Sequence, residues 1–193
     1  MAASHAQPGT PGFGAVLLTG GTAVRLDGAD KAGIEVGGRT LLEIALAALG
    51  DAGEVVVVGE EVPTSRPVTF RREEPAHGGP AAGVLAGLAG FARPWDWVVV
   101  LAVDMPRVTR TTVGRLLTGR GPEGSVLVDA EGRRQPLCAV YAARSLAAAG
   151  EAHGIPMQRL VGGLDLAEVP AAGDEARDVD SWADVRRLRE EPS

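Results

Sequence analysis

The chain has 193 residues, of which 45% are hydrophobic and 4% aromatic, and its formal net charge is −6 at pH 7. This length and apolar content predict one large α/β domain with an aliphatic core and exclude a disordered chain. The net charge gives no electrostatic basis for non-specific nucleic-acid binding, and the longest apolar run is too short to cross a membrane. The lone cysteine, Cys138, excludes an internal disulfide and is typical of a cytoplasmic protein.

The N-terminal part of the sequence predicts a tail, two strands and a helix. Residues 1–12 lack the basic start and continuous apolar segment of a signal peptide, so we expect a flexible tail. Residues 13–18 and 55–58 are short apolar runs suited to buried strands. Between them, Thr40-Leu41-Leu42-Glu43 has the pattern of a capping box, which predicts the start of a helix.

The rest of the chain continues the alternation of strands and helices. Residues 97–103 are the most apolar stretch, which predicts a central strand covered by helices on both faces of a sheet. Gly78-Gly79-Pro80 and either Thr109 or Thr111 predict the starts of helices that flank this strand. Further strands are expected at residues 68–70, 125–129 and 135–141, and further helices at residues 142–152 and from Ser181 onward. The pattern predicts a single three-layer α/β domain over residues 13–190.

The loop after the first predicted strand is a candidate phosphate-binding segment. It runs from Leu18 to Lys31, contains the small residues Thr19, Gly20 and Gly21, and carries two cations, Arg25 and Lys31. Glycine lets a ligand approach the backbone closely, and cations neutralise phosphate oxygens. The loop does not have the spacing of a P-loop or of a dinucleotide-binding fingerprint. From residue types alone, a plain flexible loop is an equal alternative.

A second candidate is Asp104, which directly follows the apolar run 97–103. Ligands of open α/β sheets bind beyond the carboxyl ends of the strands, where a carboxylate can hold Mg²⁺ against phosphate oxygens. A turn or capping aspartate is the other interpretation. Lys31 is the only lysine among the 19 basic residues, and it lies in the loop that would face Asp104.

Five motifs in sequence order resemble those of molybdenum cofactor guanylyltransferases and related nucleotidyltransferases. Leu18-Thr19-Gly20-Gly21 with Arg25 and Asp30-Lys31 is similar to the loop signature of that family. The other four are Gly79-Pro80-Ala81-Ala82-Gly83, Val103-Asp104-Met105-Pro106, Arg134-Gln135-Pro136-Leu137-Cys138 and Asp178-Val179-Asp180-Ser181. The resemblance implies a Rossmann-like, GT-A-like fold with a mostly parallel mixed sheet. It also implies transfer of GMP from GTP, or another NTP, to molybdopterin, with Mg²⁺ as cofactor and pyrophosphate as product.

The resemblance also assigns site residues. Arg25, Lys31 and Asp104 would be catalytic, with Asp104 holding the metal and Asp180 as a second candidate ligand. The nucleotide would contact Leu18, Thr19, Gly20 and Gly21, with Thr19 and the glycines acting through the backbone, and also Lys31, Glu74, Gly79 and Asp104. Arg134 and Gln135 would face the acceptor.

Four positions depart from the family pattern. Asp27 stands where the loop usually has glycine, and Gly59 stands where a polar residue, commonly Asn, follows the second strand. Asp178 and Asp180 replace two Asn residues, so Asp180 is either a second metal ligand or a residue that helps begin the last helix. Two other functions therefore remain open: a cytidylyltransferase or sugar-phosphate nucleotidyltransferase, and a catalytically weak relative that binds nucleotide or cofactor.

Overall fold

The computed structural model of the chain describes residues 12–20, 30–72, 78–150 and 154–190. Its main sheet has seven strands in the order β5-β4-β1-β6-β8-β7-β9. Their bounds are β1 Gly14–Leu18, β4 Glu54–Val58, β5 Thr69–Arg71, β6 Trp97–Ala102, β7 Gly124–Val128, β8 Arg134–Ala142 and β9 Ala167–Pro170. In this sheet β8 pairs antiparallel with both of its neighbours, and the other pairs are parallel. The sheet is therefore mixed and mostly parallel, as the resemblance implies.

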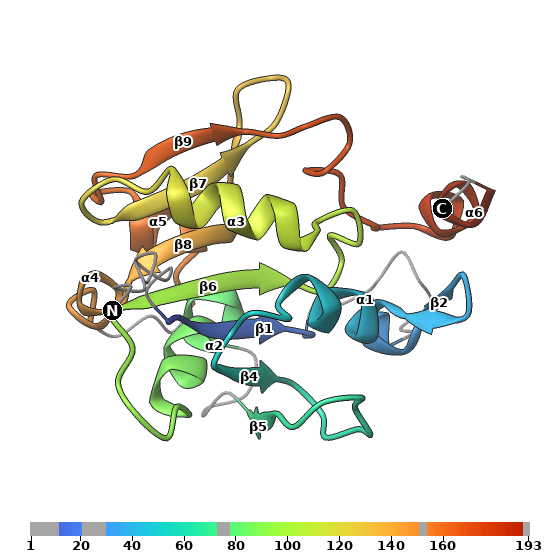
Figure 1. Ribbon diagram of the computed structural model, residues 1–193, viewed down its shortest axis with the longest axis horizontal. Helices are drawn as coiled ribbons and strands as arrows, with labels where there is room; N and C mark the ends of the chain where they lie inside the picture. The colour runs from blue at the N-terminus through green and yellow to red at the C-terminus, as the bar shows by residue number, and fades with distance from the viewer. Residues whose placement is uncertain (1–11, 21–29, 73–77, 151–153, 191–193) are drawn as a thin grey trace, which may run out of the picture.

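Helices cover both faces of this sheet (Figure 1). Helices α1 (Leu41–Ala48) and α3 (Arg110–Thr118) bury their apolar residues in one core, and α2 (Gly79–Ala89), α4 (Ala143–Ala147) and α5 (Met157–Val161) bury theirs in the other. Alternate residues of β1 enter the two cores: Ala15 and Leu17 on one face, Val16 and Leu18 on the other. Strand β1 is therefore buried on both faces, which explains its continuous apolar sequence. The predicted three-layer α/β fold is confirmed.

Helix α2 packs directly against β1. A Cβ atom placed on Gly87 would lie 2.4 Å from Val16 Cγ1, so only glycine fits at this contact. The short distance fixes α2 against the strand that leads into the candidate loop. Glycine at residue 87 therefore has a packing role.

Several smaller elements are not predicted by the sequence pattern. They are the 3₁₀ helix η2 (Lys31–Gly33), the two-stranded ribbon of β2 (Glu35–Val36) and β3 (Arg39–Thr40), and the elements α5 and β9. The last helix, α6 (Trp182–Glu190), lies beside β2 at one side of the molecule (Figure 1). There the Arg189 guanidinium donates to the Glu35 carbonyl at 2.8 Å.

The helix starts follow their predicted caps with two refinements. Thr40 Oγ1 accepts from the Glu43 N–H at 3.2 Å, but the Glu43 carboxylate accepts from Ser65 instead of returning to the cap. Of the two candidate caps for α3, the structure uses Thr109, whose hydroxyl accepts from the Thr112 N–H. The helix expected over residues 142–152 ends at Ala147, and Gly150 has a φ of 74°, which stops the helix. Its residues 151–152 lie outside the described residues.

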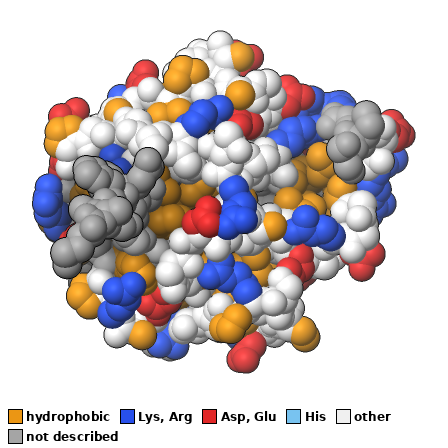
Figure 2. Space-filling model, viewed as in Figure 1, with side chains coloured by type: hydrophobic (Ala, Val, Ile, Leu, Met, Phe, Trp, Pro, Cys, Tyr) orange, Lys and Arg blue, Asp and Glu red, His pale blue; other side chains and the backbone are white. Residues whose placement is uncertain are grey.

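Acidic and basic side chains are interspersed on the face that Figure 2 shows. Among the helices in the described ranges, none is long and apolar enough to cross a membrane.

Candidate active site

The candidate loop begins where β1 ends, beside the end of β6. The two strands pair along their length, and the Val103 N–H extends the pairing by donating to the Leu18 carbonyl at 2.9 Å. The chain proceeds from β1 outward to β4 and β5, and then returns to β6 on the other side of β1. This reversal of strand order is the place where open α/β sheets bind ligands. Leu18 is buried there, Thr19 is half-buried and Gly20 is exposed.

The loop itself is described only in part. Gly21, Arg25 and Asp27 lie outside the described residues, as does Glu74 in the segment 73–77. Their expected roles stay predictions. The Thr19 N–H donates to the Val58 carbonyl at 3.1 Å, and the expected backbone contact of Thr19 with the nucleotide stays a prediction.

Lys31 lies between two carboxylates from distant parts of the chain. Its Nζ atom is 2.9 Å from Asp104 Oδ2 and 2.8 Å from Asp180 Oδ1. The side chain of Lys31 is 12% exposed, while those of Asp104 and Asp180 are 26% and 49% exposed. The ammonium is therefore the most buried member of an acid–base–acid arrangement at the end of β6.

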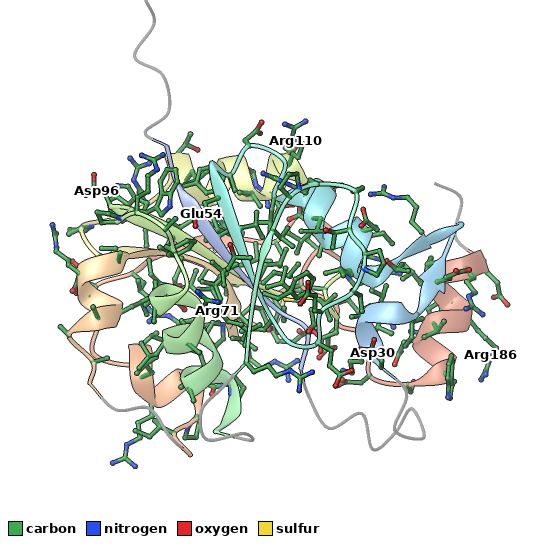
Figure 3. All side chains as sticks on the ribbon, turned by 90° about the horizontal axis from the view of Figure 1, so that it is seen from below. Asp30, Glu54, Arg71, Asp96, Arg110 and Arg186 are labelled. Carbon is green, nitrogen blue, oxygen red and sulfur yellow. The ribbon has the colours of Figure 1, made fainter. Side chains whose placement is uncertain are left out.

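Local structure explains how these three residues meet. Asp30 caps η2 by accepting from the Ala32 N–H at 3.1 Å, which fixes the backbone that carries Lys31. The Val179 N–H donates to the Asp104 carbonyl at 2.8 Å and draws the segment before α6 to the end of β6. Figure 3 shows Asp30 at this end of the sheet, with Glu54 and Asp96 toward the opposite end. The departure from the family pattern at Asp180 therefore places a second carboxylate on Lys31.

The electrostatics of the cluster favour a cation. Burial opposes the charge of Lys31, but the hydrogen bond to Asp180 and the attraction of Asp104 outweigh it and raise the pKa of Lys31. Burial, together with the negative charges of Asp180 and Asp104, raises the pKa of Asp178. With one ammonium facing this group of aspartates, the described part of the cluster has an excess of negative charge.

A pocket of about 500 Å³ opens next to Asp104. Its wall includes Gly79 at the start of α2, Gln135 on β8, and Met157 and Gln158 on α5. Gln135 Nε2 also donates to Asp129 Oδ2 at 3.2 Å, which orients the amide. The pocket therefore brings together Gly79 and Asp104, predicted for the nucleotide, and Gln135, predicted for the acceptor.

Arg134 lies apart from that pocket wall. Its Nε donates to Glu168 Oε1 at 2.8 Å, and both side chains are about half exposed. The pairing holds the guanidinium toward β9, and the pocket residues do not include Arg134. Its acceptor-binding role stays a prediction.

The contribution of α5 to the pocket is not predicted by the sequence pattern. Ile155, Pro156, Met157 and Gln158 line the pocket, although no motif marks them. The available signal was Pro156, which precedes the first residue of the helix as an N-terminal proline often does. That signal predicts a helix start, and it does not predict that the helix faces a site.

Cys138 has no catalytic role in this arrangement. The side chain is buried in β8, and burial raises the pKa of the thiol to about 12. A thiol with so high a pKa is a poor nucleophile at neutral pH. Cys138 is therefore a small core residue of β8.

The sheet order, with the Lys31–Asp104 pair at its switch point, defines an open α/β protein that binds its ligand at the carboxyl ends of the strands. A family model described as the MobA-like NTP transferase domain matches residues 15–166. The chain belongs to this MobA-like NTP transferase family, and it is a nucleotidyltransferase.

Individual relatives agree with this assignment. The chain is 38% identical over 139 residues to a probable molybdenum cofactor guanylyltransferase from Opitutus terrae. The aligned region covers 69% of this chain and 68% of that protein. It is 34% identical over 148 residues to a molybdenum cofactor guanylyltransferase from Rhodopseudomonas palustris, covering 72% of this chain and 68% of the relative. A solved nucleotidyl transferase from Methanothermobacter superposes with a TM-score of 0.73 at 20% identity, covering 92% and 96% of the two chains. This last likeness shows the fold.

Proposed function

We propose that the protein transfers GMP from GTP to the phosphate of molybdopterin, with Mg²⁺ as cofactor and pyrophosphate as leaving group. The observation that carries the proposal is Lys31 Nζ held between Asp104 and Asp180 beside the end of β1. Relatives named molybdenum cofactor guanylyltransferases support the choice of GTP and of the acceptor. The resemblance of the loop also favours GTP over CTP: this chain has Gly20-Gly21, where the pattern of cytidylyltransferases has Ala-Gly.

The donor set suits Mg²⁺. Asp104 and Asp180 both reach one cation, the Lys31 ammonium, which shows that two carboxylate oxygens converge on a positive charge. Within the described residues, no group of three His, Cys, Asp or Glu side chains is arranged to hold a metal. Mg²⁺ is usually held by one or two carboxylates, together with substrate phosphates and water. Asp104, with Asp180 as a second ligand, fits that pattern.

The chain's own residues would act mainly by positioning and by charge. Bound Mg²⁺ supplies positive charge that offsets the charge of the phosphates. Lys31, and Arg25 in the loop, would stabilise the charge that develops on the departing pyrophosphate.

Other residues would bind the two substrates. Gly20, Gly21 and Gly79 would leave room for the nucleotide close to the backbone, and Glu74 would contact the base or ribose. Gln135 would orient the acceptor in the pocket. Arg134, which pairs with Glu168 beside β9, stays a predicted acceptor contact.

The test is a substrate titration of the purified protein with Mg²⁺. GTP, CTP, ATP and UTP are titrated separately, and pyrophosphate release is measured after molybdopterin is added. We expect selective GTP binding and release that depends on molybdopterin. Selective use of CTP would instead indicate a cytidylyltransferase. Absence of NTP binding would contradict the proposal and favour a carrier of the cofactor.

A variant of Lys31 separates a catalyst from a catalytically weak binder. Lys31→Ala should lower kcat by about 10²–10³, the usual effect of losing one charge-stabilising donor, while GTP binding is largely retained. Arg186→Ala is the matched control, because it also removes one cation, and Arg186 points outward on the exposed side of α6 (Figure 3). Unchanged turnover in Lys31→Ala would exclude its catalytic role.

A further inference from the structure

Gly59, at the end of β4, is next to Thr19, at the end of β1. A Cβ atom placed on Gly59 would lie 1.8 Å from Thr19 Oγ1 and 3.2 Å from Thr19 Cβ. The backbone of Gly59 does not have a positive φ in the range that favours glycine. Glycine is therefore required at this position by the side chain of Thr19 and not by backbone strain. Thr19 occupies the space that a side chain at residue 59 would need.

Thr19 is held in this place by two hydrogen bonds to one carbonyl. Its Oγ1 donates to the Val58 carbonyl at 3.0 Å, and its N–H donates to the same oxygen at 3.1 Å. The N–H of Gly59, the residue after β4, donates to the Arg71 carbonyl at 2.9 Å. The end of β4 is thus held between Thr19 and β5, and the bond from Oγ1 to Val58 fixes the rotamer of the Thr19 side chain.

The first of these bonds decides what the hydroxyl can recognise. A threonine hydroxyl has one proton and two acceptor lone pairs. Its proton is used by Val58, so a ligand meets an oxygen that can only accept. A phosphate group at neutral pH also offers mainly acceptors, so this oxygen does not favour phosphate. Ribose hydroxyls and base N–H groups are donors, and Thr19 is half-buried at the ligand-binding end of the sheet.

We propose that Thr19 Oγ1, in the space left by Gly59, accepts a hydrogen bond from the nucleoside part of the bound NTP and thereby contributes to substrate selection. The proposal rests on the proposed nucleotidyl transfer, and it makes Thr19 a side-chain reader of ribose or base. The polar side chain that is usual at residue 59 in the family pattern is then replaced by that of residue 19, which follows the neighbouring strand. Gly59 and Thr19 act as a pair: the glycine makes room, and the threonine supplies the acceptor.

The first experiment measures nucleotide affinity without the acceptor. Isothermal titration with Mg²⁺ compares wild type, Thr19→Val and Thr19→Ser for GTP, 2′-deoxy-GTP, 3′-deoxy-GTP and ITP. Valine keeps the volume and removes the acceptor, so we expect a threefold to tenfold loss in GTP affinity, as for one hydrogen bond. Serine keeps the hydroxyl and should bind GTP within about twofold of wild type.

The analogues identify the donor. Wild type should bind one analogue more weakly than GTP, and Thr19→Val should bind that analogue and GTP equally. The analogue concerned assigns the contact to the 2′-hydroxyl, the 3′-hydroxyl or the guanine amino group. If Thr19→Val binds all four nucleotides with the wild-type affinities, the proposal is overturned while the proposed function stands. If wild type binds no NTP, both fail.

A second measurement tests the pairing without any nucleotide. Gly59→Ala should lower the thermal midpoint of wild type, because its methyl group collides with Thr19 Oγ1. In a Thr19→Ala background, Gly59→Ala should lower the thermal midpoint by a clearly smaller amount, since the Thr19 oxygen is absent. Equal losses in the two backgrounds would show that the two residues do not share this space.

Discussion

Glu175 is the residue on which the packing of the C-terminal segment against α3 depends. Its carboxylate accepts from the Thr112 hydroxyl at 2.7 Å and the Ala172 N–H at 2.8 Å, and it pairs with the Arg115 guanidinium. The Glu175 side chain is 12% exposed, and Arg115 Nε is buried with no hydrogen-bond partner in the described part of the chain. Arg115 would thus be left as a poorly compensated cation if Glu175 lost its charge.

We therefore predict that Glu175→Gln lowers the free energy of unfolding at pH 7 by about 1–3 kcal/mol. Burial alone would raise the pKa of Glu175, but its hydrogen bonds and Arg115 outweigh burial and lower the pKa below the ordinary value of 4.5. A lowered pKa stabilises the fold above pH 4.5, and this stabilisation is lost as the pH falls through the pKa of the folded state. Urea unfolding at several pH values should show that the difference in free energy of unfolding between wild type and Glu175→Gln decreases below pH 4.5.

The control is Glu168→Gln, which removes an ion pair with Arg134 whose side chains are 46% and 53% exposed. Exposed pairs contribute about 0–1 kcal/mol, so this variant should be nearly neutral. If the difference in free energy of unfolding between wild type and Glu175→Gln stays the same in acid, the proposed role of the Glu175 charge is contradicted.

At the scale of single elements, caps decide where the helices begin. Helix α3 has apolar residues on one face only, and its first turn is closed by reciprocal hydrogen bonds between Thr109 and Thr112. Thr111 is the second residue of the helix, and it is exposed. The two threonines look equivalent in the sequence, and the structure distinguishes them.

This difference predicts the outcome of two alanine substitutions. Thr109→Ala should lower the free energy of unfolding by about 1 kcal/mol, because the Thr112 N–H loses its acceptor. Thr111→Ala should stay within about 0.5 kcal/mol of wild type, as exposed substitutions usually do. Chemical denaturation of both variants measures the difference. A larger loss in Thr111→Ala than in Thr109→Ala would contradict the cap assignment.

For the whole molecule, the site joins segments that are remote in sequence, so ligand binding should stabilise the entire fold. A ligand at 100 times its Kd stabilises the native state by about 2.7 kcal/mol. For a chain of this size, that corresponds to a rise in the thermal midpoint of roughly 5–11 °C. We predict this rise for GTP with Mg²⁺, and a smaller one for GTP in the presence of EDTA.

Asp104→Asn and Asp96→Asn form a matched pair for this measurement, since the two aspartates lie beyond opposite ends of β6. The first should lose the part of the rise that depends on Mg²⁺, and the second should keep it, because Asp96 is exposed at the far end of the sheet (Figure 3). An undiminished rise in Asp104→Asn would exclude Asp104 as the metal ligand.

The layered α/β fold, its central strand and the main helix starts could be predicted from local sequence patterns. These depend on local chemistry: the apolar run of β6, the valines of β4, and the Gly-Gly-Pro and threonine caps of α2 and α3. A strand buried on both faces must be apolar throughout, and a helix end must satisfy its free N–H groups. Such requirements can be recognised in short segments. The family resemblance then marked the loop after β1 and Asp104 as parts of one site.

Which side chains meet in this site depends on the tertiary structure and could not be predicted from local patterns. Lys31 contacts Asp104 across 73 residues of sequence and Asp180 across 149, and no local pattern carries that information. The same holds for the pocket wall supplied by α5, and for Thr19, whose side chain fills the space beside Gly59. The physical reason is that such contacts depend on how strand ends and connecting segments are packed in three dimensions, whereas the sequence pattern specifies each element separately.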